Sequence, residues 1–259
     1  MRIGIIPAAG TGSRIQPLAF SKELLPVGSR LENGIERPRA VSEYLIERLI
    51  TGGAQRLCFV ISPDKSDIVS YFGNRVEGIP VCYVVQPSPA GLCDALFSAL
   101  PFLGRDDTAL VGLPDTIWFP VDAFGALPDD VLSFALFPVD DPQLFDAVVL
   151  DEEGLVAEIQ VKSDHASTPW VWGAFKAPAG VMAILERLWR QRQPRDQFFG
   201  TLVNAHLARG GMAVGVRAGT AYVDVGTFNG YRRAIRALEA RGGGEGASRP
   251  ALDMSEVRT

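Results

Sequence analysis

The feature that most constrains the fold is an alternation of short apolar runs with longer amphipathic segments along the first half of the chain. Continuous apolar runs of this length are typical of strands that are buried on both faces of a parallel sheet. Strands are predicted at Ile3–Ile6, Leu57–Ile61, Val81–Val85 and Ala109–Leu113, and helices at residues 41–53, 65–72 and 90–103. Regular alternation of this kind predicts a Rossmann-like α/β fold with right-handed crossovers.

The second half of the chain mixes strands and helices less regularly. Strands are predicted at Phe134–Val139, Phe145–Leu150, Leu155–Val161, Trp170–Phe175, Met212–Arg217 and Thr220–Val225, and helices at Val181–Gln191, 198–209 and Tyr231–Arg241. No repeat or linker divides the chain. We therefore expect one domain, residues 1–241, with a mixed, mostly parallel central sheet flanked by helices and an inserted second lobe. Residues 242–259 are rich in glycine and poor in apolar side chains, and are predicted to form a disordered tail.

Charge and cysteine content exclude several classes of protein. The net charge of -5 argues against a nucleic-acid binder, which needs a basic surface to neutralise phosphates. No apolar stretch approaches the length of a membrane span, so no membrane partner is expected. The three cysteines lack metal-ligand spacing, and their odd number argues against a disulfide framework. We expect a cytoplasmic protein.

The strongest functional signal is the segment GIIPAAGTGSRIQPLAFSKELLPVG, residues 4–28. A turn made of Ala9, Gly10, Thr11 and Gly12 follows the first predicted strand, where backbone N–H groups can approach phosphate oxygens. The turn lacks the Gly-Lys-Ser/Thr ending of a Walker loop. It also departs from the dinucleotide fingerprint, whose third glycine would fall at Ile15. Two cations, Arg14 and Lys22, follow the turn and distinguish this segment from the similar glycine turns of many Rossmann-type folds.

Four ordered segments resemble the sugar-nucleotide pyrophosphorylases, the family of glucose 1-phosphate thymidylyl- and uridylyltransferases. They are residues 4–28, QPSPAGLCDAL at 86–96, GLPDT at 112–116 and YVDVGTFNGY at 222–231. The resemblance implies an enzyme that condenses a nucleoside triphosphate with a sugar 1-phosphate and releases pyrophosphate. It further implies a nucleotide-binding half, about residues 1–120, and a sugar- and metal-binding half, residues 121–241, which contains the inserted sugar-binding lobe.

The resemblance assigns the charged residues to catalysis and to a metal ion. Arg14 and Lys22 match the catalytic cations, because nucleotidyl transfer needs positive charge beside the α-phosphate and the departing pyrophosphate. Asp115 and Asp224 match the ligands of Mg²⁺, a cation that prefers one or two carboxylates together with phosphate oxygens. The alternatives are surface cations and helix-capping or turn aspartates.

The nucleotide-binding set predicted from the resemblance comprises Ala9, Gly10, Thr11, Gly12, Gln86, Gly91 and Asp115. Gln86 carries an amide that can both donate and accept, which suits the pairing edge of a base. Gly91 would let the base lie close to the backbone. These residues favour dTTP or UTP, and the ordinary alternative is a turn before a helix. Asp94 stands where related thymidylyltransferases usually carry a neutral residue, and the resemblance assigns it no role.

The predicted sugar site comprises Glu158, Lys162, Trp172 and Gly173, and it departs from the family pattern. Lys162 matches the lysine that contacts the sugar phosphate, and strand alternation would place Glu158, Gln160 and Lys162 on one face. Val161 replaces the usual sugar-gripping glutamate, Asp146 replaces a glycine, and Trp172 replaces a small polar residue, although core packing is equally open for Trp172. These changes predict an acceptor other than plain glucose 1-phosphate, such as a modified sugar phosphate or a cyclitol phosphate.

Two further interpretations stay open at the level of sequence. One is a cytidylyl- or guanylyltransferase that acts on a cyclitol phosphate or another alcohol phosphate. The other is a catalytically inactive, nucleotide-sensing homologue, which the presence of Lys22 and both aspartates disfavours. A homo-oligomer is also left open.

Overall fold

The computed structural model describes residues 1–88 and 90–242 and is built on one ten-stranded mixed sheet. Its strands are ordered β11-β10-β12-β7-β1-β4-β6-β5, while β9 pairs with β12 and with β13. The strands are β1 (Arg2–Pro7), β4 (Arg56–Ile61), β5 (Arg75–Val76), β6 (Ile79–Val85), β7 (Thr108–Gly112), β9 (Leu132–Pro138), β10 (Asp146–Leu150), β11 (Val156–Val161), β12 (Trp170–Pro178) and β13 (Ala213–Val216). Strands from both halves of the chain therefore share one sheet.

The central strands β7, β1, β4 and β6 are parallel, as the alternation of apolar runs and helices predicts. Beyond them the sheet continues through β12, which is antiparallel to β7, β9 and β10. The α/β fold with a mixed central sheet flanked by helices is thus confirmed, and its parallel part is limited to these four strands and the β9–β13 pair. The carboxyl ends of the parallel strands meet at one edge, where open α/β sheets bind ligands.

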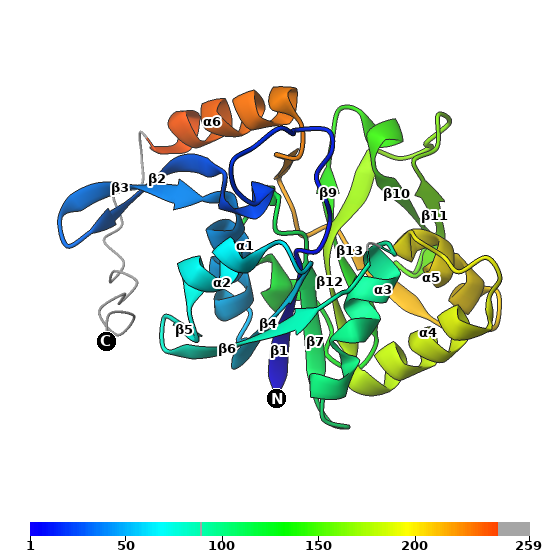
Figure 1. The fold of residues 1–259 in the computed structure, drawn as a ribbon. Coiled ribbons are helices and arrows are strands. Elements are labelled where there is room, and N and C mark those ends of the chain that lie inside the picture. The colour runs from blue at the N-terminus through cyan, green and yellow to red at the C-terminus, as the bar shows by residue number, and fades with distance from the viewer. Residues whose placement is uncertain (89, 243–259) are drawn as a thin grey trace.

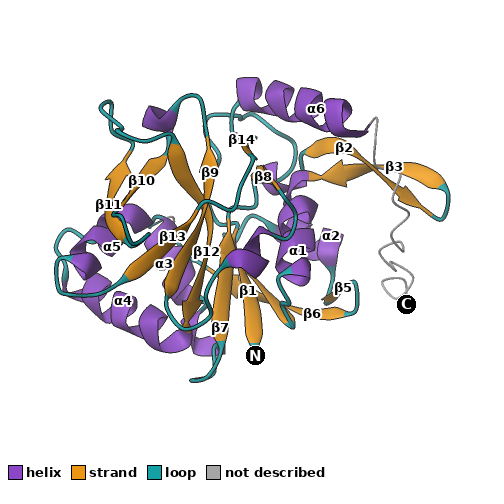
Figure 2. Cartoon of the chain, turned by 180° about the vertical axis from the view of Figure 1, so that it is seen from behind, coloured by secondary structure: helices purple, strands orange, loops and turns teal. Residues whose placement is uncertain are grey.

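Helices cover both faces of this sheet (Figures 1 and 2). On one face a core cluster joins the sheet to α1 and α2, and on the other face a second cluster joins it to α3, α4 and α5. The sixth helix packs against β14 and β2. The helices are α1 (Val41–Thr51), α2 (Ser66–Phe72), α3 (Leu92–Ser98), α4 (Ala179–Gln191), α5 (Phe199–Leu207) and α6 (Phe228–Gly242).

Two small antiparallel sheets lie beside the main one. The first pairs β8 (Thr116–Phe119) with β14 (Ala221–Asp224), and the second is a hairpin of β2 (Pro26–Glu32) and β3 (Ile35–Ala40). A third apolar cluster, which includes Val27, Tyr44 and Ala234, connects these sheets to α1 and α6. The β8–β14 pair has a direct consequence for function, because it brings residue 224 next to residue 115.

The structure corrects several predicted elements. The hairpin β2–β3 and strand β8 lie in segments for which no strand was predicted. The predicted helix 90–103 divides into α3 and a short 3₁₀ turn at Leu100–Phe102, since Pro101 lacks the N–H that a continuous helix requires. Residues 243–259, most of the predicted disordered tail, lie outside the described residues. Within the described ranges, no helix has both the length and the apolar content to cross a membrane.

Candidate active site

The two aspartates predicted to bind a metal lie side by side. Asp224 is the last residue of β14 and pairs with Thr116, and the Val225 N–H donates to the Asp115 carbonyl at 2.8 Å. A Cβ added to Gly226 would lie 2.8 Å from Asp224 Oδ1, 3.1 Å from Asp115 Oδ2 and 3.2 Å from Arg14 Nη2. Both carboxylates and one guanidinium therefore face the same small volume, and the absence of a side chain at Gly226 leaves room for this arrangement.

Both predicted cations reach these carboxylates. Lys22 Nζ donates to Asp115 Oδ2 at 2.5 Å, and both side chains are largely buried. Arg14 Nη2 lies 3.4 Å from Asp224 Oδ2, but the arginine side chain is 64% exposed. Lys22 is thus held firmly in the site, whereas Arg14 lies at its exposed rim.

The pKa shifts in this cluster follow from burial and from the pairing of charges. Burial opposes the charge of Asp115, but the Lys22 ammonium outweighs that effect and lowers the pKa of Asp115. Burial also opposes the charge of Lys22, and the carboxylates of Asp115 and Glu23 raise the pKa of Lys22 in spite of it. For Asp224, burial and the neighbouring charge of Asp115 act together and raise the pKa. A bound cation would relieve this repulsion between the two aspartates.

The donor set fits Mg²⁺ that arrives with a phosphate ligand. Within the described ranges, no group of three or more His, Cys, Asp and Glu side chains is arranged to hold a metal by itself. Asp115 and Asp224 supply two carboxylates, and Mg²⁺ is usually bound by one or two carboxylates plus substrate phosphates. The two aspartates therefore suit a magnesium–triphosphate complex better than a permanently bound ion.

The glycine turn lies directly beside this cluster. The backbone N–H groups of Gly10, Thr11 and Gly12 donate no hydrogen bond to any described residue, so they are free to bind a ligand. Gly12 has φ of +63°, and a Cβ there would lie 2.5 Å from the Lys22 side chain. Glycine at this position therefore permits both the turn and the close approach of Lys22, as expected of a loop that binds phosphate.

A buried ion pair beneath the turn was not predicted from the sequence. Lys65 Nζ donates to the carbonyls of Ala8 at 2.6 Å and Gly10 at 2.7 Å, and to both carboxylate oxygens of Glu23 at 2.8–2.9 Å. Glu23 is fully buried and neighbours Lys22. Lys65 therefore connects the glycine turn to the segment that carries Lys22, and holds both parts of the phosphate site in place.

The residues predicted to contact the base lie at the carboxyl end of β6, on the same edge of the sheet. Gln86 is only 3% exposed, and its side-chain amide donates to Asp94 Oδ2 at 2.5 Å. Gly91 has φ of +92°, and a Cβ there would lie 2.9–3.0 Å from Gln197. The Leu92 N–H also donates to the Gln197 carbonyl. Glycine at position 91 is thus required by the approach of the segment that leads into α5.

Two of the predicted sugar-site residues, Trp172 and Gly173, lie in β12, beside Asp146 at the start of β10. The Trp172 indole N–H donates to Asp146 Oδ2 at 3.3 Å, while most of the indole packs in the core against Phe134 and Phe199. Burial raises the pKa of Asp146, against the effects of the Trp172 hydrogen bond and the Lys162 charge. A Cβ on Gly173 would lie 2.5 Å from the Tyr222 ring, so glycine there lets that ring pack against β12.

Strand alternation predicted a common face for Glu158, Gln160 and Lys162, and this basis is wrong because Lys162 lies outside β11. Lys162 follows the last residue of β11 with φ of +45°, which interrupts strand alternation. Its Nζ lies 4.6 Å from the Phe198 ring centre, beside the start of α5. Glu158 is exposed and accepts a hydrogen bond from Gln160. Asp146 pairs with Val161 across the β10–β11 ladder and is affected by the charge of Lys162, and it was not among the predicted sugar contacts.

Comparison with known proteins shows which protein family this chain belongs to. Residues 3–241 match the nucleotidyl transferase family. The chain belongs to this family. The prediction of a nucleotidyltransferase enzyme of the sugar-1-phosphate type is therefore confirmed at the level of the class.

Individual relatives and solved structures agree with this assignment. A Mycolicibacterium smegmatis protein named glucose-1-phosphate thymidylyltransferase is 29% identical over 257 aligned residues, which cover 93% of this chain and 84% of the relative. A Bacillus anthracis structure in complex with sucrose aligns with a TM-score of 0.77 and 24% identity over 95% of this chain and 98% of its own. The UTP-bound UGPase of Acinetobacter baumannii aligns with a TM-score of 0.72 and 20% identity over 92% and 94%. The two structural alignments establish the fold.

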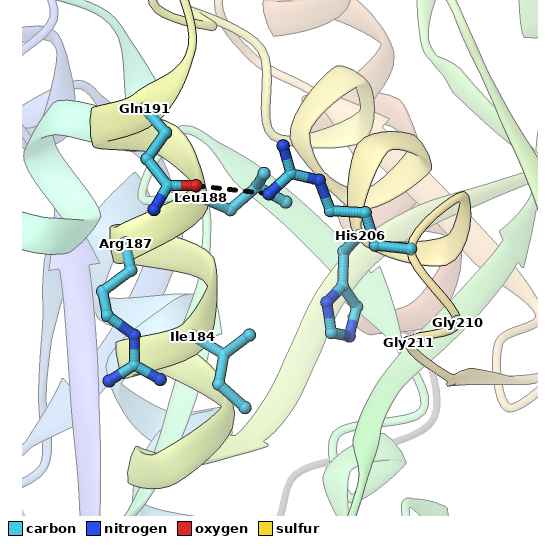
Figure 3. Close-up of a pocket in the computed structure, with 8 residues that line it drawn as sticks. Ile184, Arg187, Leu188, Gln191, His206, Gly210 and Gly211 are labelled. Atoms are coloured by element: carbon cyan, nitrogen blue, oxygen red, sulfur yellow. Dashed lines mark hydrogen bonds between the residues drawn. The ribbon is translucent and has the colours of Figure 1, made fainter.

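The nucleotidyl transferase also has a cavity of about 400 Å³ on another surface, between α4 and α5 (Figure 3). Its lining includes Arg187, Gln191, His206 and Arg209, and Arg209 donates to the Gln191 side chain. None of the residues predicted from the motifs lines it. The cavity is therefore separate from the candidate active site, which the carboxylates, the cations and the glycine turn define.

Proposed function

We propose that the enzyme transfers a nucleotidyl group from dTTP or UTP to a sugar 1-phosphate and releases pyrophosphate. One observation carries this proposal: Lys22, Arg14, Asp115 and Asp224 meet around one small volume beside a glycine turn with free N–H groups. Phosphate binding, charge stabilisation and metal binding are the three requirements of nucleotidyl transfer, and this cluster can supply all of them.

The reaction needs no general base from the protein. An oxygen of the sugar phosphate is already anionic and attacks the α-phosphorus in line. A new P–O bond forms, the bond between the α-phosphorus and the bridging oxygen breaks, and the electron pair leaves with pyrophosphate. The chain contributes by holding the two phosphates in position, which in well-oriented systems lowers a barrier by roughly 7–11 kcal/mol.

Each charged residue has a distinct role in the proposal. The turn from Ala9 to Gly12 binds the triphosphate through its N–H groups. Lys22 uses one of its three donors on Asp115, which leaves two for phosphate oxygens. Arg14 approaches from the rim to stabilise charge on the departing pyrophosphate. Mg²⁺, when held by Asp115 and Asp224, would neutralise charge on the phosphates and help to align them.

Binding of the base and the acceptor is assigned to the two neighbouring groups of residues. Gln86 and Gly91 read the base, and Lys162 orients the sugar phosphate. The acceptor is proposed to be a modified sugar phosphate or a cyclitol phosphate, because Asp146 places a half-buried carboxylate beside Lys162. Contacts from Gly173, Trp172 and Glu158 to the acceptor stay predictions, as do the cytoplasmic location, a homo-oligomer and the division at about residue 120.

A pyrophosphate-release screen tests the proposal. It would cross the common nucleoside triphosphates with a panel of sugar 1-phosphates and cyclitol phosphates, with and without Mg²⁺. We expect release that depends on Mg²⁺ and on both substrates, with dTTP or UTP preferred. Release with CTP or GTP but not with dTTP or UTP would favour the cytidylyl- or guanylyltransferase alternative. Nucleotide binding without any turnover would favour the inactive, nucleotide-sensing alternative.

A further inference from the structure

Asp94 has no part in the reaction described above, yet it makes the shortest contact to the residue proposed to read the base. We propose that Asp94 fixes the Gln86 amide so that Gln86 presents only a hydrogen-bond acceptor to the nucleobase. Among the pyrimidines, the enzyme then selects uracil or thymine, which carry N3–H at that edge, over cytosine. This inference rests on the proposed function and names Asp94 as a positioning residue for nucleotide choice.

The Gln86 amide is held on its nitrogen side. Its Nε2 donates to Asp94 Oδ2 at 2.5 Å and lies 3.5 Å from the Gly91 carbonyl oxygen. Asp94 lies in the first turn of α3, and its own backbone carbonyl accepts a hydrogen bond from the Ser98 hydroxyl. The Gln86 backbone N–H donates to the Ile61 carbonyl at 2.8 Å. Both partners in this contact are therefore anchored to the main elements of the fold.

The chemistry of the partners determines which end of the amide faces them. An ionised carboxylate and a backbone carbonyl only accept hydrogen bonds, so the NH₂ group of Gln86 must face Asp94 and Gly91. A flipped amide would place its oxygen against the Asp94 carboxylate, and two acceptors would then repel each other. The orientation of the amide thus follows from the identity of residue 94.

The carbonyl oxygen of Gln86 accepts no hydrogen bond from the described residues, and it is not one of the fully buried side-chain atoms that lack a partner, so it stays open to a ligand although the residue as a whole is 3% exposed. A bound base would cover this oxygen, and an acceptor that is buried without a partner is costly, so a ligand that supplies an N–H is favoured over one that supplies a lone pair. Uracil and thymine carry N3–H, whereas N3 of cytosine carries a lone pair. A site whose polar groups match one ligand rejects the mismatched analogue strongly.

Asp94→Asn tests the inference, because its amide can donate to the Gln86 oxygen and so permits the flipped orientation. We would measure kcat and KM for UTP, dTTP and CTP in the wild type, in Asp94→Asn and in Asp94→Glu. The wild type should prefer UTP or dTTP to CTP. Asp94→Asn should reduce that preference at least about 10-fold, mainly through KM, and Asp94→Glu should retain most of it. Asp106→Asn, which removes an exposed carboxylate elsewhere, serves as the matched control and should leave the ratio unchanged.

Dissociation constants for UTP and CTP, measured by calorimetry without acceptor, repeat the test independently of turnover. A wild-type preference for CTP, or an Asp94→Asn variant whose ratio of UTP to CTP affinity stays at the wild-type value, would overturn the role of Asp94. Absence of turnover with a normal UTP preference in binding would instead count against the proposed reaction. The two failures are therefore distinguishable.

Discussion

The phosphate region and the sugar region of this molecule differ in how completely their polar groups are paired. In the phosphate region, Lys22 pairs with Asp115 and Lys65 pairs with Glu23, both at short distances. In the sugar region, Asp146 has one long hydrogen bond to Trp172 and no cation within bonding distance among the described residues. The first region is preorganised by the chain itself, whereas the second leaves a half-buried carboxylate that a ligand can satisfy.

This difference corresponds to two functions: charge stabilisation, which all nucleotidyl transfer requires, and choice of acceptor, which can differ between members of the family. Charge stabilisation at the phosphates is common to every nucleotidyl transfer, so it depends on fixed, internally paired groups. Choice of acceptor depends on groups that are paired only when the correct ligand is bound. Substitutions in the first region should therefore reduce turnover with all substrates, and substitutions in the second should change the ranking of substrates.

The largest effect is expected at the carboxylates. Asp115→Asn should lower kcat about 10³-fold with every substrate pair, because it weakens metal binding and removes the partner of Lys22. Steady-state pyrophosphate release measures this, and Asp140→Asn, an exposed aspartate, is the matched control. A loss of kcat with only one acceptor would contradict the proposed difference between the phosphate region and the sugar region.

Lys22→Ala should lower kcat at least about 10²-fold, the typical scale for one lost charge-stabilising donor. The loss should again be similar for every nucleotide and acceptor. Arg105→Ala removes an exposed cation elsewhere and should leave kcat unchanged in the same assay. Unchanged turnover of Lys22→Ala would refute the role proposed for this lysine.

Lys65→Met should act through the position of the glycine turn. It leaves Glu23 buried without a partner, so the free energy of unfolding should fall by about 3 kcal/mol in denaturant titrations. The double variant Lys65→Met/Glu23→Leu should recover most of this stability, because no uncompensated charge remains. The KM of this double variant for the nucleotide should still be about 10-fold higher than that of the wild type. A double variant with both stability and KM at wild-type values would show that Lys65 does not position the turn.

The smallest effect is expected at Asp146. Asp146→Gly should change the ratio of kcat/KM for glucose 1-phosphate over a modified acceptor about 10-fold in favour of glucose 1-phosphate, with kcat for the best pair nearly unchanged. Asp146→Asn keeps the shape and should give an intermediate ratio. An equal loss with all acceptors would place Asp146 with the phosphate region instead.

Most residues of the phosphate region could be recognised from the sequence because their signals are local, but the pairing of Asp115 with Asp224 was predicted from the family resemblance alone. A buried strand, a glycine turn and an aspartate at a strand end can each be recognised in a few residues. The β2–β3 hairpin escaped prediction because its polar strands conceal it, although Asn33 and Gly34 have φ of 51° and 79°, and Asn-Gly is a common hairpin turn. The pairing of Lys65 with Glu23 joins residues 42 positions apart and has no local pattern. The positive φ of Lys162 likewise cannot be inferred from strand alternation.

The central claim is that Asp115 and Asp224 together bind a divalent cation beside the glycine turn. Mn²⁺ binding can be measured by electron paramagnetic resonance in the presence of a UTP analogue with a methylene bridge between the α- and β-phosphorus atoms. We expect the wild type to bind one Mn²⁺ in a manner that depends on the analogue, and the double variant Asp115→Asn/Asp224→Asn to lose this binding. Unaltered Mn²⁺ affinity in the double variant would contradict the account.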